Sequence, residues 1–194
     1  MSARAETIRP GSAAECATAA AVVVLGCALL MLRLQVLGRS GAAPLLAATY
    51  VAILSGAILV RVPAGLEGRP STGPIIAATL MGAGAVVAAA TVAGPSIPVP
   101  VPALALVMNA LAAVGEEALF RRAAFGWLAR FGPVTAVVAT AVLFALVHVP
   151  VYGASALPVD LGAGLLFGWQ RAVSGTWTVP AATHVVANLV TVLR

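Results

Sequence analysis

Charge is the scarcest feature of this sequence. Charged residues make up 9% of the 194 positions, only six residues are acidic, and all eleven basic residues are arginine. Soluble domains carry about 25% charged residues, whereas this chain is 61% hydrophobic and has a mean hydropathy of +1.06. The composition therefore excludes an ordinary soluble domain and predicts an all-α, polytopic transmembrane helical bundle.

Other absences narrow the class further. The sequence has no ten-residue alternating strands of an outer-membrane barrel, and no basic run with interleaved aromatics indicates a nucleic-acid partner. We interpret the arginines, Arg33 and Arg171 among them, as loop charges that set topology and contact the lipid bilayer. The only two cysteines, Cys16 and Cys27, are eleven positions apart on one expected helix. That spacing is about 16 Å along the axis, too far for a disulfide.

Apolar segments separated by turn residues predict about seven spans. We expect helices at residues 17–32, 42–60, 74–92, 102–130, 133–148, 159–173 and 177–194. The first is interpreted as a retained span rather than a signal peptide, because Arg33 follows it directly. Pro150 is expected to end the fifth, and Gly164 with Gly168 gives the sixth a small-residue packing face. An exposed loop at 61–73 and a proline-rich linker at 94–102 complete the pattern.

Two adjacent acids stand out against this background. Glu116 and Glu117 follow a stretch of twenty residues, 96–115, that carries no charge. A carboxylate at the bilayer centre costs roughly 2.5–3.5 kcal/mol on insertion scales, so it usually faces a partner or water. Glu117 and Arg121 are four positions apart and are expected to pair along one helix. Glu116, about 100° around that helix, then points elsewhere.

The chain has two histidines, and both lie in apolar segments. His148 is about 16 residues after the turn at 131–132, and Glu116 is about 15 residues before it. Equal distances from a hairpin turn mean equal depth, roughly 23 Å along each helix, so these two side chains are predicted to lie side by side. His184 and Asn188 share one helix face, and Asn109 lies near the face of Glu116. Taken alone, a buried histidine or asparagine is more often a packing residue. The combination of these side chains at compatible depth favours a functional site.

The chemistry of this set is hydrolytic. A carboxylate and an imidazole around one water form a general-base pair, while a second imidazole and an amide can donate to an oxyanion. Zinc held by Glu116, His148 and His184 with one open position is the alternative. A His-Glu-x-x-His motif is absent, however, and no cysteine lies near in the sequence, so no cofactor is favoured.

Three segments stand out together: Glu116-Glu117-x-x-x-Arg121, Phe144-x-x-x-His148 and His184-x-x-x-Asn188. They resemble the motifs of a known family, the CAAX protease and bacteriocin-processing (CPBP) family, also called type II CAAX proteases or Abi proteins. The resemblance spans about residues 108–192 and implies an intramembrane endopeptidase with its core at 101–194. Residues 1–100 are expected to add further helices to the same bundle.

The resemblance also assigns roles by position. Water activation falls to Glu116 and His148, oxyanion stabilisation to His184 and Asn188, and support of the site to Glu117 and Arg121. Metal-independent, glutamic-type hydrolysis is favoured over zinc chemistry. The implied partner is a membrane-embedded or lipidated peptide or protein, and the implied location is a bacterial cytoplasmic membrane.

One position departs from the family pattern. Arg122 stands where the family commonly has glycine, which puts close packing there in question; we otherwise interpret Arg122 and Arg130 as interfacial anchors. Two alternative functions stay open: a non-catalytic bacteriocin-immunity protein of the same fold, and a small transporter or proton-relay protein. Substrate sequence, side of entry and oligomeric state are not indicated by the sequence.

Overall fold

The computed structural model describes residues 12–62, 71–94 and 100–193. The structure is 86% helical, and its described residues form no strand, which confirms the all-α membrane bundle. The α-helices are α1 (Ala13–Leu32), α2 (Ala43–Leu59), α3 (Thr72–Val92), α4 (Ala103–Glu117), α5 (Phe125–Leu128), α6 (Pro133–Tyr152), α7 (Leu157–Ser174) and α8 (Thr178–Val192). Shorter helical turns are η1 (Arg33–Gln35), η2 (Ala118–Ala124), η3 (Ala129–Phe131) and η4 (Ala154–Ala156).

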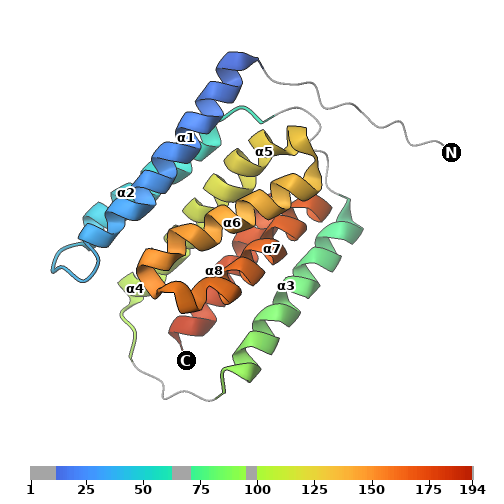
Figure 1. The fold of residues 1–194 in the computed structure, drawn as a ribbon. Coiled ribbons are helices and arrows are strands. Elements are labelled where there is room, and N and C mark those ends of the chain that lie inside the picture. The colour runs from blue at the N-terminus through green and yellow to red at the C-terminus, as the bar shows by residue number, and fades with distance from the viewer. Residues whose placement is uncertain (1–11, 63–70, 95–99, 194) are drawn as a thin grey trace.

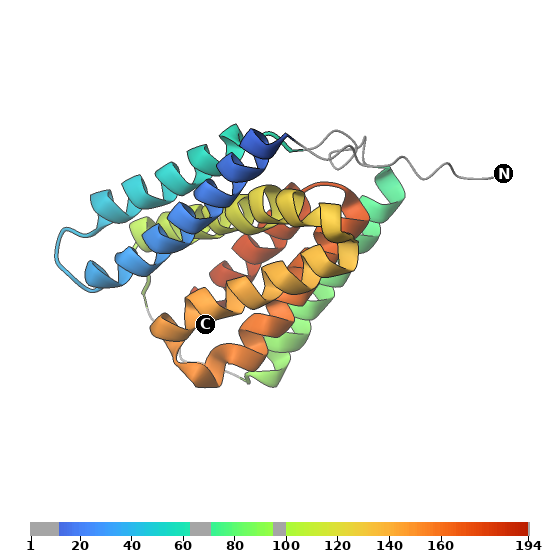
Figure 2. The same ribbon diagram turned by 45° about the horizontal axis from the view of Figure 1, so that its top comes forward.

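The helices are arranged around the segment that carries the two adjacent acids. α1 and α2 run side by side as an N-terminal hairpin, and α3 lies at the opposite edge of the bundle against α7 and α8 (Figures 1 and 2). α4 and η2 lie between the hairpin and the C-terminal helices, in contact with both. The main hydrophobic core joins α1, α2, η2, α6 and α7. α1, α2 and α3, which precede residue 100, therefore all contact the helices that follow it.

Four helical segments are long and apolar enough to cross a membrane. They are Ala13–Gln35, Thr72–Val92, Ala103–Phe131 and Pro133–Tyr152. α2 and α8 are apolar but shorter, and α7, which carries one acid and one arginine, is not in the group of four. Parts of the expected loop and linker, residues 63–70 and 95–99, lie outside the described residues.

The expected long fourth helix is confirmed as one 29-residue helical segment, Ala103–Phe131. It is not a uniform α-helix, because η2, immediately after Glu117, is a π-helix of seven residues. A π-helix has more residues per turn than an α-helix and frequently occurs at functional sites. The wider turns change the directions of the side chains that follow the acid pair, and the sequence pattern did not predict this.

Small residues bring α6 and α7 together. A Cβ added to Gly164 would lie 2.9 Å from the Cα of Ala141, and one added to Gly168 would lie 3.2 Å from the Cα of Val137. The predicted packing face of these two glycines is therefore confirmed.

The expected end of the fifth span at Pro150 is wrong. α6 continues to Tyr152 with Pro150 inside its last turn, and it ends at Gly153, where φ is +82°. Proline removes one backbone donor, and near a helix end in a membrane protein the loss of that single bond is tolerated.

Candidate active site

Glu116 lies at the end of α4 and points into the bundle. Only 3% of its surface is exposed. One carboxylate oxygen, Oε2, lies 3.5 Å from Nε2 of His148 on α6. The prediction that counting from the turn places these two side chains at equal depth is confirmed. The other oxygen, Oε1, accepts a hydrogen bond from Nη1 of Arg33 at 2.5 Å.

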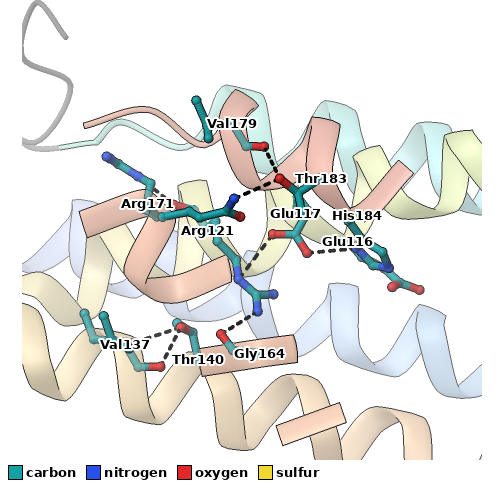
Figure 3. Close-up of polar contacts among 12 residues, drawn as sticks. Glu116, Glu117, Arg121, Val137, Thr140, Gly164, Arg171, Val179, Thr183 and His184 are labelled. Carbon is teal, nitrogen blue, oxygen red and sulfur yellow. Dashed lines mark hydrogen bonds and ion pairs between the residues drawn. The ribbon is translucent and has the colours of Figure 1, made fainter. Parts of the chain in front are cut away.

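Glu117 faces a different set of partners. Its Oε2 lies 3.2 Å from Nε of Arg121, one turn along the same helical segment, which confirms the predicted pair. Its Oε1 lies 2.9 Å from Nδ1 of His184 on α8. Arg121 is fully buried and donates from Nη2 to the carbonyl of Gly164 on α7 at 3.1 Å. Figure 3 shows Glu117 between Arg121 and His184, with Glu116 turned away from that pair.

Backbone and carboxylate acceptors fix the tautomers of both histidines. Nδ1 of His148 lies 2.7 Å from the carbonyl oxygen of Phe144. A carbonyl only accepts, so Nδ1 carries a proton and Nε2 is the nitrogen that faces Glu116. Nδ1 of His184 likewise faces an acceptor, the carboxylate of Glu117. In each ring, therefore, one nitrogen is held by the protein and Nε2 is left for chemistry.

The ring of Phe144 lies beside both histidines. Its centroid is 4.4 Å from that of His148 and 5.6 Å from that of His184. The Arg121 guanidinium lies over the same ring at 4.7 Å, and Phe167 stacks on His184 with centroids 5.0 Å apart. Two imidazoles from α6 and α8 thus meet at one aromatic side chain, so the two halves of the polar set form a single site.

The two asparagines differ in their surroundings. Asn188 is half-buried one helical turn beyond His184, and among the described residues its amide makes no hydrogen bond. Its donor is therefore available to another group. Asn109 instead donates to the carbonyl of Ala105 on its own helix at 2.9 Å. Asn109 is satisfied locally and contributes no group to the site.

Sequence reasoning missed two groups near Glu116. Arg33, interpreted as a loop charge, is 5% exposed, and its Nη1 also donates to the Tyr50 hydroxyl at 3.4 Å. The correction has a local cause. α1 ends at Leu32 and continues into the 3-10 turn η1, which directs Arg33 back into the bundle. An arginine directly after an apolar run gave no sequence signal that separates it from an interfacial anchor.

Arg171 was also wrongly interpreted as a loop charge. It is buried, and its Nε donates to the backbone carbonyl of Arg121 at 2.9 Å. That carbonyl belongs to the π-helix, where regular helical bonding is altered. Arg171 therefore ties α7 to the backbone beside the acid pair.

Arg122 is not a simple interfacial anchor. It is half-buried, and its Nη1 donates to the carbonyl of Ala57 and to that of Val60, the latter at 2.9 Å. These carbonyls lie at the end of α2, where helices leave acceptors without intrahelical partners. The arginine that replaces a family glycine thus links α2 to η2. Arg130 is exposed, in agreement with its interpretation as an interfacial anchor.

Each of the two buried acids of the site contacts one buried arginine. Two carboxylates and two guanidinium groups are all at most 5% exposed: Arg33, Glu116, Glu117 and Arg121. Removing one member of a buried pair typically costs 3–5 kcal/mol, because its partner stays behind unpaired. Each acid therefore has its own arginine, Arg33 for Glu116 and Arg121 for Glu117. Each acid also contacts one histidine.

Zinc coordination by Glu116, His148 and His184 is the alternative that the sequence left open. Within residues 12–62, 71–94 and 100–193, no three His, Cys, Asp or Glu side chains are grouped so that they could hold a metal. The two histidines also contact different acids, one through Nε2 and the other through Nδ1. Zinc sites require at least three such ligands converging on one point.

Comparison with known proteins finds a family for the C-terminal part of the chain. Residues 98–190 match the family model of type II CAAX prenyl endopeptidases, Rce1-like. No curated protein and no solved structure shows significant similarity to the chain. The matched segment contains both acids, both histidines and Asn188, and it ends within α8. Residues 98–190 thus match a Rce1-like, type II CAAX prenyl endopeptidase domain, which confirms the resemblance to CPBP intramembrane proteases.

Proposed function

We propose that this chain is an intramembrane endopeptidase in which Glu116 and His148 activate the attacking water. One observation carries the proposal: a carboxylate oxygen and Nε2 of an imidazole face each other at 3.5 Å inside an apolar bundle. The distance is long for a direct hydrogen bond, yet one water can contact both groups. Such a water is polarised by two acceptors at once.

In the proposed reaction the pair Glu116 and His148 takes a proton from the water as its oxygen attacks the peptide carbonyl carbon. The tetrahedral intermediate carries a negative oxygen, which accepts a hydrogen bond from the Asn188 amide. His184 is the second group proposed at the oxyanion, and the contact of its Nδ1 with Glu117 orients the ring. The proton held by the first pair then passes to the leaving amine as the C–N bond breaks.

The proposal does not require a metal, since the residues named supply the base, the oxyanion donors and the counter-charges. The substrate we propose is a membrane-embedded or lipidated peptide or protein. The family description names prenyl endopeptidases, so a farnesylated CAAX peptide is the first defined probe. An unmodified peptide of the same sequence shows whether the lipid is needed.

The test is a mass-spectrometric survey of new peptide termini in membranes. Membranes that hold the wild-type chain are compared with membranes that hold Glu116→Gln or His148→Ala at equal amounts. We expect wild-type-specific termini that disappear in both variants. Asn109→Ala, at a polar position that bonds only to its own helix, is the matched control and retains them.

Two outcomes would overturn the proposal. Termini that persist in both variants would remove Glu116 and His148 from catalysis. An absence of wild-type-specific termini, with the farnesylated peptide also left intact, would favour a non-catalytic binding protein such as an immunity factor. In that case a proton-flux assay in liposomes separates the binding protein from a relay.

A further inference from the structure

The N-terminal hairpin reaches the proposed site through one side chain that lies outside the matched domain. Arg33 follows α1, eighty-three positions before Glu116 in the sequence, and forms its shortest contact with that carboxylate. Both side chains are at most 5% exposed. The contact therefore lies inside the bundle, where it is protected from screening by salt.

Arg33 is itself held by a second residue of the hairpin. Tyr50 of α2 is 6% exposed, and its hydroxyl accepts from the same Nη1 that contacts Glu116, at 3.4 Å. Tyr50 also packs against the helix that carries the acid, since a Cβ on Gly115 would lie 3.2 Å from its backbone oxygen. η1, which directly follows α1, and α2 thus each supply one member of a chain of contacts that ends at Glu116.

The arrangement restricts Glu116 more strongly than a general counter-charge would. Arg33 contacts Oε1, while His148 faces Oε2. A carboxylate fixed through one oxygen presents the other in a defined direction. For a general base this direction decides whether a water is aligned for attack, and a misplacement of about 1 Å can slow a reaction about 100-fold.

We propose that Arg33, supported by Tyr50, is the positioning residue of Glu116, so that the α1–α2 hairpin completes the site of the C-terminal domain. This inference rests on the proposed function. Arg33 acts through the carboxylate and touches neither substrate nor water in the proposed reaction. The matched domain, residues 98–190, is then insufficient for full activity without the hairpin.

The first test compares rates per folded molecule in the full-length chain. Arg33→Gln is expected to slow the formation of wild-type-specific termini about 10- to 100-fold. Arg33→Lys, which keeps the charge, restores a large part of the rate, and Tyr50→Phe lowers it about fivefold. Arg61→Gln is the control, because Arg61 pairs with Glu15 at 3.7 Å while its own side chain is 85% exposed. This control is expected to match the wild type.

The second test does not depend on activity. Thermal unfolding in detergent is measured for Arg33→Gln, Glu116→Gln and the double variant. Each single variant is expected to lower Tm, and the double variant to recover a large part of the loss, since it leaves neither charge unpaired.

The outcomes separate the two proposals. A wild-type rate in Arg33→Gln, or a double variant whose Tm losses simply add, overturns the role of Arg33 and leaves the endopeptidase proposal standing. Equal rates in Arg33→Gln and Arg33→Lys, at equal Tm, also overturn the role of Arg33, because they would show that the positive charge at this position does not affect the rate. If the wild type forms no new termini while the Tm losses are coupled, the endopeptidase proposal fails, and the positioning role fails with it.

Discussion

Gly164→Ala is the sharpest structural perturbation that the site offers. The added Cβ would lie 2.9 Å from the Cα and 3.0 Å from the carbonyl oxygen of Ala141 on α6. Both are backbone atoms, so no flexible side chain can move aside. Restoring a contact of 3.4 Å requires α6 and α7 to separate by about 0.5 Å. The carbonyl of Gly164 accepts from Arg121 at 3.1 Å, so this shift is transmitted to Glu117.

The size of the effect follows from two opposing terms. Overpacking of a tight contact costs about 1–3 kcal/mol, while alanine in a helix interior gains about 0.5–1 kcal/mol over glycine. We expect a net loss of about 1–2 kcal/mol. Gly162→Ala, two positions earlier in the same helix with nothing within 4 Å of the added Cβ, gains the helix term alone. Both variants replace glycine with alanine in the same helix, so they differ only in what the added Cβ contacts.

The assay is thermal unfolding in detergent, combined with the rate at which new termini form. At about 2–4 °C per kcal/mol for a chain of this size, Gly164→Ala is expected to lower Tm by about 2–8 °C. Its cleavage rate is expected to fall about tenfold. A displacement of about 1 Å can slow a reaction about 100-fold, and the helix separation here is about 0.5 Å. A Gly164→Ala protein as stable and as active as Gly162→Ala would refute the close α6–α7 contact and its link to Arg121.

Further predictions concern other contacts. Gly82→Ala places a Cβ 2.5 Å from the Thr183 hydroxyl, so it is expected to loosen the packing of α3 and lower Tm. Gly84→Ala, whose added Cβ has nothing within 4 Å, is expected to leave this packing unchanged. Equal Tm values for the two variants would contradict the packing of α3 on α8. Arg122→Gln is expected to lose about 1.5–3 kcal/mol of stability for its charged donor to the Val60 carbonyl, and an unchanged Tm would show that this link to α2 contributes nothing. A zinc chelator is expected to leave the rate unchanged, and a loss that added zinc restores would contradict the proposed metal-independent reaction.

Local spacing predicted much of the site because its geometry is helical. The Glu117–Arg121 pair follows from a four-residue separation on one helix. The approach of Glu116 to His148 follows from equal distances to a hairpin turn. Neither inference needs knowledge of tertiary packing beyond two antiparallel neighbours.

Contacts between distant helices could not be obtained in this way. Arg33 meets Glu116 only because η1 turns it inward, and an arginine after an apolar run is equally typical of a membrane surface. The contact of His184 with Glu117 depends on how α8 packs against α4. The π-helix after Glu117 has no propensity signal, since its residues are ordinary helix formers.

The measurement that tests the central claim most directly is the cleavage rate of Glu116→Gln, His148→Ala and the double variant in one membrane preparation. If both groups activate the same water, removing either abolishes the shared function, and the double variant is expected to be no slower than the slower single variant. Rates that multiply, so that the double variant loses the product of both single losses, would show that Glu116 and His148 act independently and would contradict the shared-water site.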